Sequence, residues 1–202
     1  MRTSLTVAIL TLLAAGSPSL ATAGSKVIDL RTVDGVKAVK GEWRYIDVKI
    51  VEVSTKSTDG KPMTTYNIQP KAFGPDFNDS SWELCDPTTL KNPRGGGQVC
   101  FCWYRIKITI PEEAKGKSVF FQSTVDDYGE VWVDGKLPRK PGDSGGPVVA
   151  GFNTPNRVEL KDVKPGKVYQ IAIFGINGPI SAEPGNRIFL GKTFLEIVDP
   201  VK

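Results

Sequence analysis

The sequence has 202 residues, a formal net charge of +4 and no histidine, and 40% of its residues are hydrophobic. This length suits one domain with a sizeable core. The slight basic excess is spread without basic blocks, so the chain lacks the charge pattern that is typical of a nucleic-acid-binding protein.

Residues 1–23 have the features of a secretory signal peptide. A positively charged start precedes an apolar run over residues 5–15, and small residues before position 24 fit a cleavage site. The run is shorter than the roughly 20 residues that are needed to span a bilayer. We therefore expect residues 24–202 to form one secreted or periplasmic domain that makes no membrane contact after cleavage.

Eight later segments alternate apolar and polar residues with the period of two that is typical of β-strands. In chain order they are residues 43–53, 64–69, 99–110, 118–125, 128–138, 156–160, 168–176 and 187–198. The segment 128–138 contains Asp134-Gly135, which predicts a turn. Loops rich in glycine, proline and aspartate separate the segments. This pattern predicts an all-β jelly-roll sandwich of about eight antiparallel strands, with loops gathered at its ends.

Three cysteines occur at positions 85, 100 and 102. In the segment 99–110 the even-numbered residues are apolar, which places Cys100 and Cys102 on one buried face. Two cysteines at i and i+2 on a strand lie too far apart to form a disulfide without distortion. Buried thiols are therefore favoured, while a disulfide from Cys85 to one of the pair, or metal or redox chemistry, stays open.

The segment GDSGGP at 142–147 is spelled like the segment around the nucleophilic serine of trypsin-like proteases. Chymotrypsin-type chemistry needs an imidazole to take the proton of the serine, and this chain has no histidine. Glycine, aspartate, serine and proline are also turn-forming residues. We therefore interpret Ser144 as part of a loop and not as a catalytic residue.

The odd-numbered residues of 99–110 point away from the apolar face if the strand is regular. Trp103 and Arg105 then form an aromatic and cationic pair on a second surface. An indole can stack on the CH face of a sugar, and a guanidinium can donate hydrogen bonds to hydroxyls or a carboxylate. In the alternative interpretation, Trp103 packs beneath a loop and Arg105 pairs with a nearby acid.

A second group of candidate residues lies in the segment VDDYGEVWVDG. Tyr128 and Trp132 share the outer face of the predicted strand, and Asp126 and Asp127 stand where the chain turns. Carboxylates there can accept hydrogen bonds from sugar hydroxyls, hold a structural Ca²⁺ ion, or only form Asx turns. They are poor candidates for a general acid and base, because glycosidic carboxylates face each other across a substrate.

Two later loops add side-chain amides of the kind that sugar pockets use, at Asn153 and Asn177, although asparagine also suits left-handed turns. The candidate ligand-binding residues are therefore Trp103, Arg105, Asp126, Asp127, Tyr128, Trp132, Asn153 and Asn177. We predict no catalytic residue, and no cofactor other than the Ca²⁺ ion considered above.

Three segments in order, FNDSSWELC, CWYRIKITIP and VDDYGEVWVDGKLP, resemble the sugar-binding jelly-roll domain of glycoside hydrolase family 2, a member of the galactose-binding-like superfamily. The match covers about residues 74–176. A longer pattern, through GGPVVAGFNTPNRVEL and VKPGKVYQIAIFGINGPIS, is similar to the accessory domain attached to gluconolactonase-like propellers of bacterial exported proteins. The chain has no propeller and is too short to add the (β/α)₈ barrel of family 2 hydrolases, so neither activity is carried over.

The resemblance implies an exported, non-catalytic module that binds carbohydrate at the loop-bearing end of the sandwich. One alternative is an interaction or accessory domain that works with a separate exported protein, either a gluconolactonase-like propeller or a glycosidase. Another alternative is a hydrolase or lactonase in its own right, which the absence of histidine disfavours.

Overall fold

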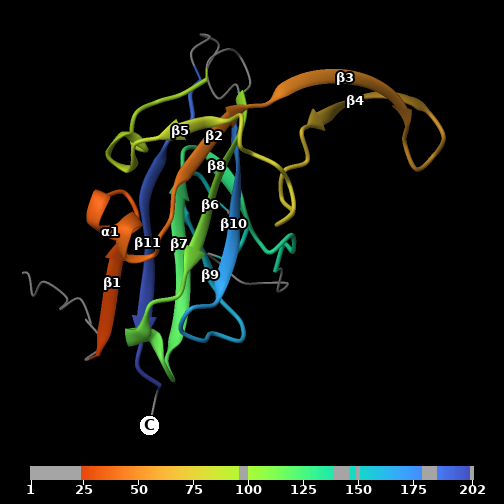
Figure 1. Cartoon of the computed structure of the whole chain (residues 1–202). Helices are drawn as coiled ribbons and strands as arrows, with labels where there is room; N and C mark the ends of the chain where they lie inside the picture. Colours follow the sequence, from red (N-terminus) through yellow and green to blue (C-terminus); the bar gives the residue numbers. More distant parts are fainter. Residues whose placement is uncertain (1–23, 96–99, 139–145, 149–150, 179–185, 201–202) are drawn as a thin grey trace, which may run out of the picture.

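The computed structural model describes residues 24–95, 100–138, 146–148, 151–178 and 186–200. Two antiparallel sheets pack face to face (Figure 1). One sheet has the strand order β1 (Ser25–Asp29), β11 (Leu190–Val198), β7 (Ser118–Val125) and β9 (Pro155–Glu159). The other has the order β5 (Glu83–Cys85), β2 (Trp43–Asp47), β6 (Cys100–Thr109), β10 (Val168–Asn177) and β8 (Tyr128–Val133). The predicted all-β sandwich is thus confirmed.

The alternation over 43–53 predicts one strand, but the structure divides this segment at Val48. The Val48 N–H still bonds the Phe101 carbonyl at 2.8 Å, and its side chain is buried. Beyond it, β3 (Lys49–Lys56) pairs with β4 (Pro62–Gln69) in a separate two-stranded sheet that projects from the sandwich (Figure 1). The period of two is the same in β2 and β3, so it does not mark where the chain leaves the main sheet.

Three helical turns complete the described elements. They are α1 (Val33–Ala38) and the 3₁₀ turns η1 (Pro87–Thr89) and η2 (Glu112–Ala114). Thr32 caps α1, because its hydroxyl accepts the Gly35 N–H at 3.0 Å. None of the helices in the described ranges is long and apolar enough to cross a membrane.

The even-numbered residues of β6 face the core between the sheets. Cys102, Tyr104 and Ile108 have no exposed surface and pack with Phe121 of β7 and Ile173 of β10. The predicted phase of this strand is therefore confirmed. The predicted turn at Asp134-Gly135 is confirmed as well: both residues have positive φ, and the N–H of residue 136 bonds the carbonyl of residue 133 at 3.0 Å.

All three cysteines are buried thiols, so the disulfide considered for Cys85 is not formed. The Cys100 Sγ donates to the Asn186 carbonyl at 2.9 Å. Burial raises the pKa of Cys85 to about 11 and raises that of Cys102 as well. Burial hides the thiols from reagents, and the raised pKa values keep Cys85 and Cys102 protonated, so little reactive thiolate is present.

We expect the native thiols to react at pH 8 with a soluble disulfide reagent about 100-fold more slowly than the thiols of denatured protein, because only the exposed thiolate attacks. Mass spectrometry of the labelled protein after quenching measures this difference. Rapid native labelling of both Cys100 and Cys102 would show that the inward face of β6 is assigned wrongly.

Candidate functional site at the loop-bearing end

The eight sequence-predicted site residues separate into two groups. Trp103, Arg105 and Trp132 lie on the outer face of the five-stranded sheet. The remaining five lie at one end of the sandwich: Asp126, Asp127, Tyr128, Asn153 and Asn177. The structure therefore does not bring the predicted residues together in one site.

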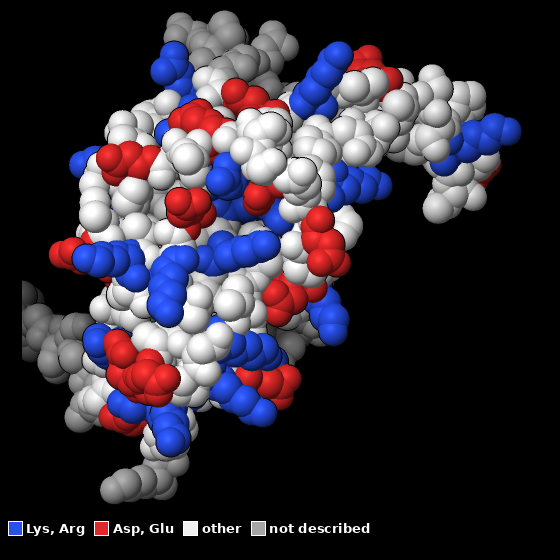
Figure 2. Space-filling view, in the orientation of Figure 1, with Lys and Arg blue, Asp and Glu red and all other residues white. Residues whose placement is uncertain are grey.

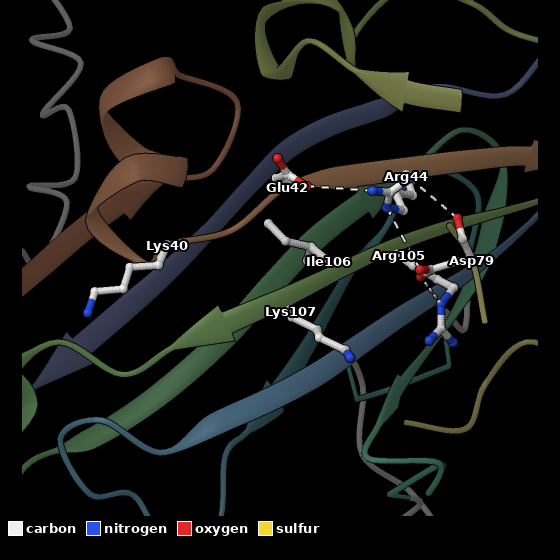
Figure 3. Close-up of a pocket in the computed structure, with 7 residues that line it drawn as sticks. All are labelled: Lys40, Glu42, Arg44, Asp79, Arg105, Ile106 and Lys107. Carbon is white, nitrogen blue, oxygen red and sulfur yellow. Dashed lines mark hydrogen bonds and ion pairs between the residues drawn. The ribbon is translucent and has the colours of Figure 1, made fainter. Parts of the chain in front are cut away.

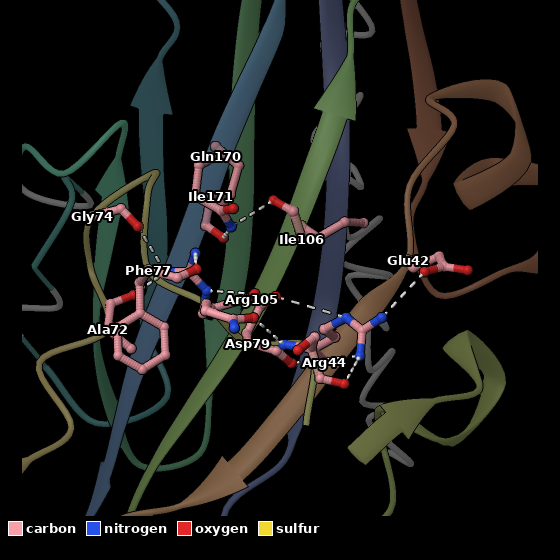
Figure 4. A network of polar contacts seen from close by, with 12 residues as sticks. Glu42, Arg44, Ala72, Gly74, Phe77, Asp79, Arg105, Ile106, Gln170 and Ile171 are labelled. Carbon is pink, nitrogen blue, oxygen red and sulfur yellow. Dashed lines mark hydrogen bonds and ion pairs between the residues drawn. The ribbon is translucent and has the colours of Figure 1, made fainter. Parts of the chain in front are cut away.

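Segment 70–82 covers the outer group, so that Trp103 and Arg105 are buried and Trp132 is half-buried. Arg105 has no exposed surface; its Nε donates to Asp79 at 2.7 Å and one terminal nitrogen donates to the Gly74 carbonyl at 3.0 Å (Figure 4). Trp103 is also buried, and its indole N–H bonds the Pro70 carbonyl at 2.8 Å. The structure thus has the arrangement of the alternative interpretation of Trp103 and Arg105, in which the tryptophan packs beneath a loop and the arginine pairs with an acid.

Aromatic packing extends this covered surface to β8. The Trp132 ring stacks on Phe73 with centroids 4.6 Å apart, and its N–H bonds Glu130 at 3.0 Å. Trp103 packs against Phe174 with centroids 4.9 Å apart. We call this group the outer cluster; its buried members are Val48, Ala72, Trp82, Trp103, Ala172 and Phe174. Its contacts are those of a folding framework.

The second group surrounds the turn between β7 and β8. Asp127 is only 4% exposed, and its backbone carbonyl accepts the Asn153 N–H at 3.0 Å. Loss of solvent, together with the neighbouring Asp126 carboxylate, raises the pKa of Asp127 to about 6. The pKa of this carboxyl group is thus well above the usual value for aspartate. Shifted pKa values of this kind are common among binding and catalytic groups.

Two exposed aromatic rings belong to the residues next to this turn, Tyr128 directly after Asp127 and Phe152 directly before Asn153. Tyr128 is 37% exposed and Phe152 is 57% exposed, with ring centroids 6.4 Å apart in an edge-on arrangement. Phe152 was not among the predicted residues, although a large apolar residue inside the polar loop GFNTPN is a signal that could have identified it. The pair offers flat apolar surface next to hydrogen-bonding groups, which is the combination that sugars require.

Buried asparagines hold the loops of this end in place. The Asn156 amide donates at 3.0 Å to both the Gly129 and Pro147 carbonyls, and the Asn177 amide donates to the Arg187 carbonyl at 2.6 Å. The Asn177 Oδ1 is buried without a hydrogen-bond partner among the described residues. Asn153 is exposed and has a positive φ of 50°, the left-handed turn geometry that asparagine tolerates.

Two further sequence interpretations concern this end. Ser144 lies outside the described residues, whereas Pro147, the last residue of GDSGGP, is buried and its carbonyl accepts the Val131 N–H at 2.7 Å. Within the described ranges, no group of three or more acidic, cysteine or histidine side chains is arranged to hold a metal ion. The Ca²⁺ ion therefore stays a hypothesis.

Comparisons with known proteins identify the fold. No protein-family model matches the sequence, and no curated protein is similar to it. A solved structure of β-glucuronidase 2 of Bacteroides uniformis, covalently bound to cyclophellitol-6-carboxylate aziridine, aligns with a TM-score of 0.50 and 14% identity over 87% of this chain. A β-glucuronidase from glycoside hydrolase family 2 aligns over 88% with a TM-score of 0.48 and 17% identity.

Each alignment covers only 18% of the length of the solved chain. The chain thus has the fold of a sandwich that forms a small part of such enzymes. At this identity the likeness extends to the fold alone.

Proposed function

We propose that this protein is an exported, non-catalytic carbohydrate-binding module. The observation that carries the proposal is the pair of exposed, contacting rings of Tyr128 and Phe152 at the turn that contains the buried residue Asp127. The rings provide stacking surface for the CH face of a sugar, and the carboxylate with the nearby amides provides acceptors and donors for its hydroxyls. The fold shared with part of a β-glucuronidase supports the same class of function.

The test is a screen of neutral glycans against the parent protein and its Tyr128→Ala and Phe152→Ala variants. Each variant is expected to bind about tenfold more weakly, because the loss of one aromatic contact costs on the order of 1–2 kcal/mol. Tyr66→Ala is a matched control, since Tyr66 is equally exposed but lies on the projecting hairpin. Unchanged binding by both site variants would contradict the proposal.

The raised pKa of Asp127 makes a pH-dependent prediction. The folded state holds the Asp127 proton more tightly than the unfolded state, so stability from this group is present below pH 4 and is lost as the pH rises to about 6. Glycan binding changes in the opposite direction, because the ionised carboxylate is the better acceptor. We expect Asp127→Asn to remove both trends, with titration calorimetry and thermal unfolding between pH 4 and 8 as the measurements. Binding that weakens from pH 5 to 7 would contradict this role.

A second candidate function is favoured by the hairpin of β3 and β4. Within the described residues its strands pair only with each other, and Val51, Met63 and Tyr66 are exposed on it. Exposed apolar residues on a projecting ribbon are typical of protein contact surfaces. In this alternative the protein is an accessory domain that contacts a separate exported protein, such as a gluconolactonase-like or glycosidase partner, and Tyr66→Ala would impair that contact without changing glycan binding.

A further inference from the structure

A pocket of about 340 Å³ lies on the outer face of the five-stranded sheet, beside the segment that covers the outer cluster (Figure 3). Four cationic and two acidic side chains line it: Lys40, Glu42, Arg44, Asp79, Arg105 and Lys107. In Figure 2, Lys and Arg side chains lie close together across the middle of the molecule, with Asp and Glu side chains around them. The pocket is lined by residues of β2 and β6, whereas the turn of Asp127 leads into β8, which β10 separates from β6, so the pocket is distinct from the site proposed above.

The two arginines of the pocket form ion pairs with both of its carboxylates. Arg105 pairs with Asp79 at 2.7 Å, and Arg44 lies 3.8 Å from the same carboxylate and 3.6 Å from Glu42. Arg44 also donates to the Ser80 carbonyl at 3.2 Å. These bonds fix the guanidinium groups against the wall, as Figure 4 shows for both arginines.

The two lysines of the pocket are different. Lys40 and Lys107 are exposed, and neither has an ion-pair partner within the described part of the chain. With both carboxylates already shared by the arginines, the pocket has an excess of two positive charges. In Figure 3 the Lys40 side chain points away from the other labelled residues, but a lysine has a flexible stem, so its ammonium group can rotate toward an anion that Lys107 contacts.

The mixture of positive and negative side chains restricts the chemical class of ligand that the pocket can bind. A polyphosphate would meet the exposed Glu42 carboxylate, whereas a ligand with one anionic group and several hydroxyls can bond the lysines and donate to Glu42. A neighbouring pocket of about 250 Å³ also contains Glu42 and is lined by apolar groups that include Val36, Pro87 and the exposed Leu84. It offers a surface for the CH face of an adjoining sugar.

We propose that this pocket is a second carbohydrate site, which binds a sugar residue that carries a carboxylate or a sulfate. The anionic group lies within reach of Lys107 and Lys40, and ring hydroxyls donate to Glu42. This inference rests on the proposed carbohydrate-binding function, but it concerns different residues and a different class of sugar. The protein would then bind an acidic polysaccharide on the outer face of the five-stranded sheet and a sugar at its loop-bearing end.

The test titrates polygalacturonate, dextran sulfate, polyuridylate and a neutral galactan into the parent protein and four variants, with calorimetry as the readout. Lys107→Gln and Lys40→Gln are each expected to weaken binding of the acidic polymer by roughly fivefold or more, the usual size of one lost charge-assisted contact. Lys192→Gln is the matched control, because Lys192 is exposed on β11 of the opposite sheet. Binding by the parent is expected to weaken in 0.5 M salt, which screens exposed charges.

Preference for polygalacturonate assigns a carboxylate and preference for dextran sulfate assigns a sulfate ester; either supports the proposal. It is overturned if the parent binds neither acidic polymer more tightly than galactan, if Lys107→Gln and Lys192→Gln behave alike, or if polyuridylate binds more tightly than both acidic polymers. Tyr128→Ala separates the two proposals, since it should weaken neutral glycan binding and leave the lysine-dependent binding unchanged. The three lysine variants should keep the thermal midpoint of the parent, because these lysines are exposed.

Discussion

Replacement of Arg105 by alanine is expected to lower the free energy of unfolding by about 3–5 kcal/mol, the usual cost of removing one partner of a buried ion pair. The change leaves Asp79 and three backbone carbonyls, those of Ala72, Gly74 and Phe77, without the guanidinium that they share. These groups belong to the segment that covers the outer cluster. Arg105 therefore ties this segment to β6, and its loss should release the cover from the sheet.

Urea unfolding followed by tryptophan fluorescence measures this effect, since Trp82 and Trp103 are both buried in the outer cluster. Arg31→Ala is a suitable control, because its pair with Asp29 is partly exposed and such pairs contribute about 0–1 kcal/mol. Arg105→Lys should also be destabilising, since a single ammonium cannot reproduce the fork of donors. An Arg105→Ala variant as stable as the parent would show that segment 70–82 is held by other contacts.

The sequence predicts the strands of the core well and predicts their cover poorly. Alternation in 99–110 assigns Cys102 and Tyr104 to the inner face because buried and solvated faces of a strand differ in composition. It does not show that the outer face is covered too, since Trp103 and Arg105 are an aromatic and a charged residue of the kind found on open surfaces. The covering segment 70–82 mixes turn-forming residues with Phe73, Phe77 and Trp82 and has no regular period, so its packing depends on contacts that are distant in sequence.

Short elements escape the same analysis for a different reason. β1 has five residues, β5 has three and α1 has six. Such lengths contain too few repeats to establish a period of either 2 or 3.6 residues. Their positions are set by neighbours instead: β1 pairs with β11, and β5 pairs with β2.

The candidate site was predictable only in part. The residues of the turn after β7, Asp126 to Tyr128, were found because the family resemblance and the chemistry of their side chains agree. Phe152 approaches Tyr128 from a loop before β9, and the lysines of the charged pocket come from β6 and from the end of the helical segment. Alternation along one strand contains no information about which residues of other elements lie beside it.

Replacement of Gly35 by alanine is expected to destabilise the protein by about 3 kcal/mol, the upper end of the usual cost of overpacking. Gly35 lies inside α1, where glycine is ordinarily about 1 kcal/mol less favourable than alanine. A Cβ at this position would lie 1.8 Å from the Asp29 carbonyl oxygen and 2.9 Å from the Thr32 hydroxyl that caps the helix. The obstacle is backbone that cannot rotate away, so the helix must shift from β1.

Gly178→Ala is the matched control, because no atom of the described residues lies within 4 Å of a Cβ placed there. The measurement compares the midpoints of thermal unfolding of Gly35→Ala and Gly178→Ala with that of the parent. If α1 is packed on the end of β1 as described, only Gly35→Ala lowers the midpoint, and Gly35→Ser should lower it by at least as much. Equal midpoints for the alanine variants at 35 and 178 would mean that α1 does not approach the Asp29 carbonyl. In the packed arrangement this close approach, rather than a need for flexibility, explains a glycine within a six-residue helix.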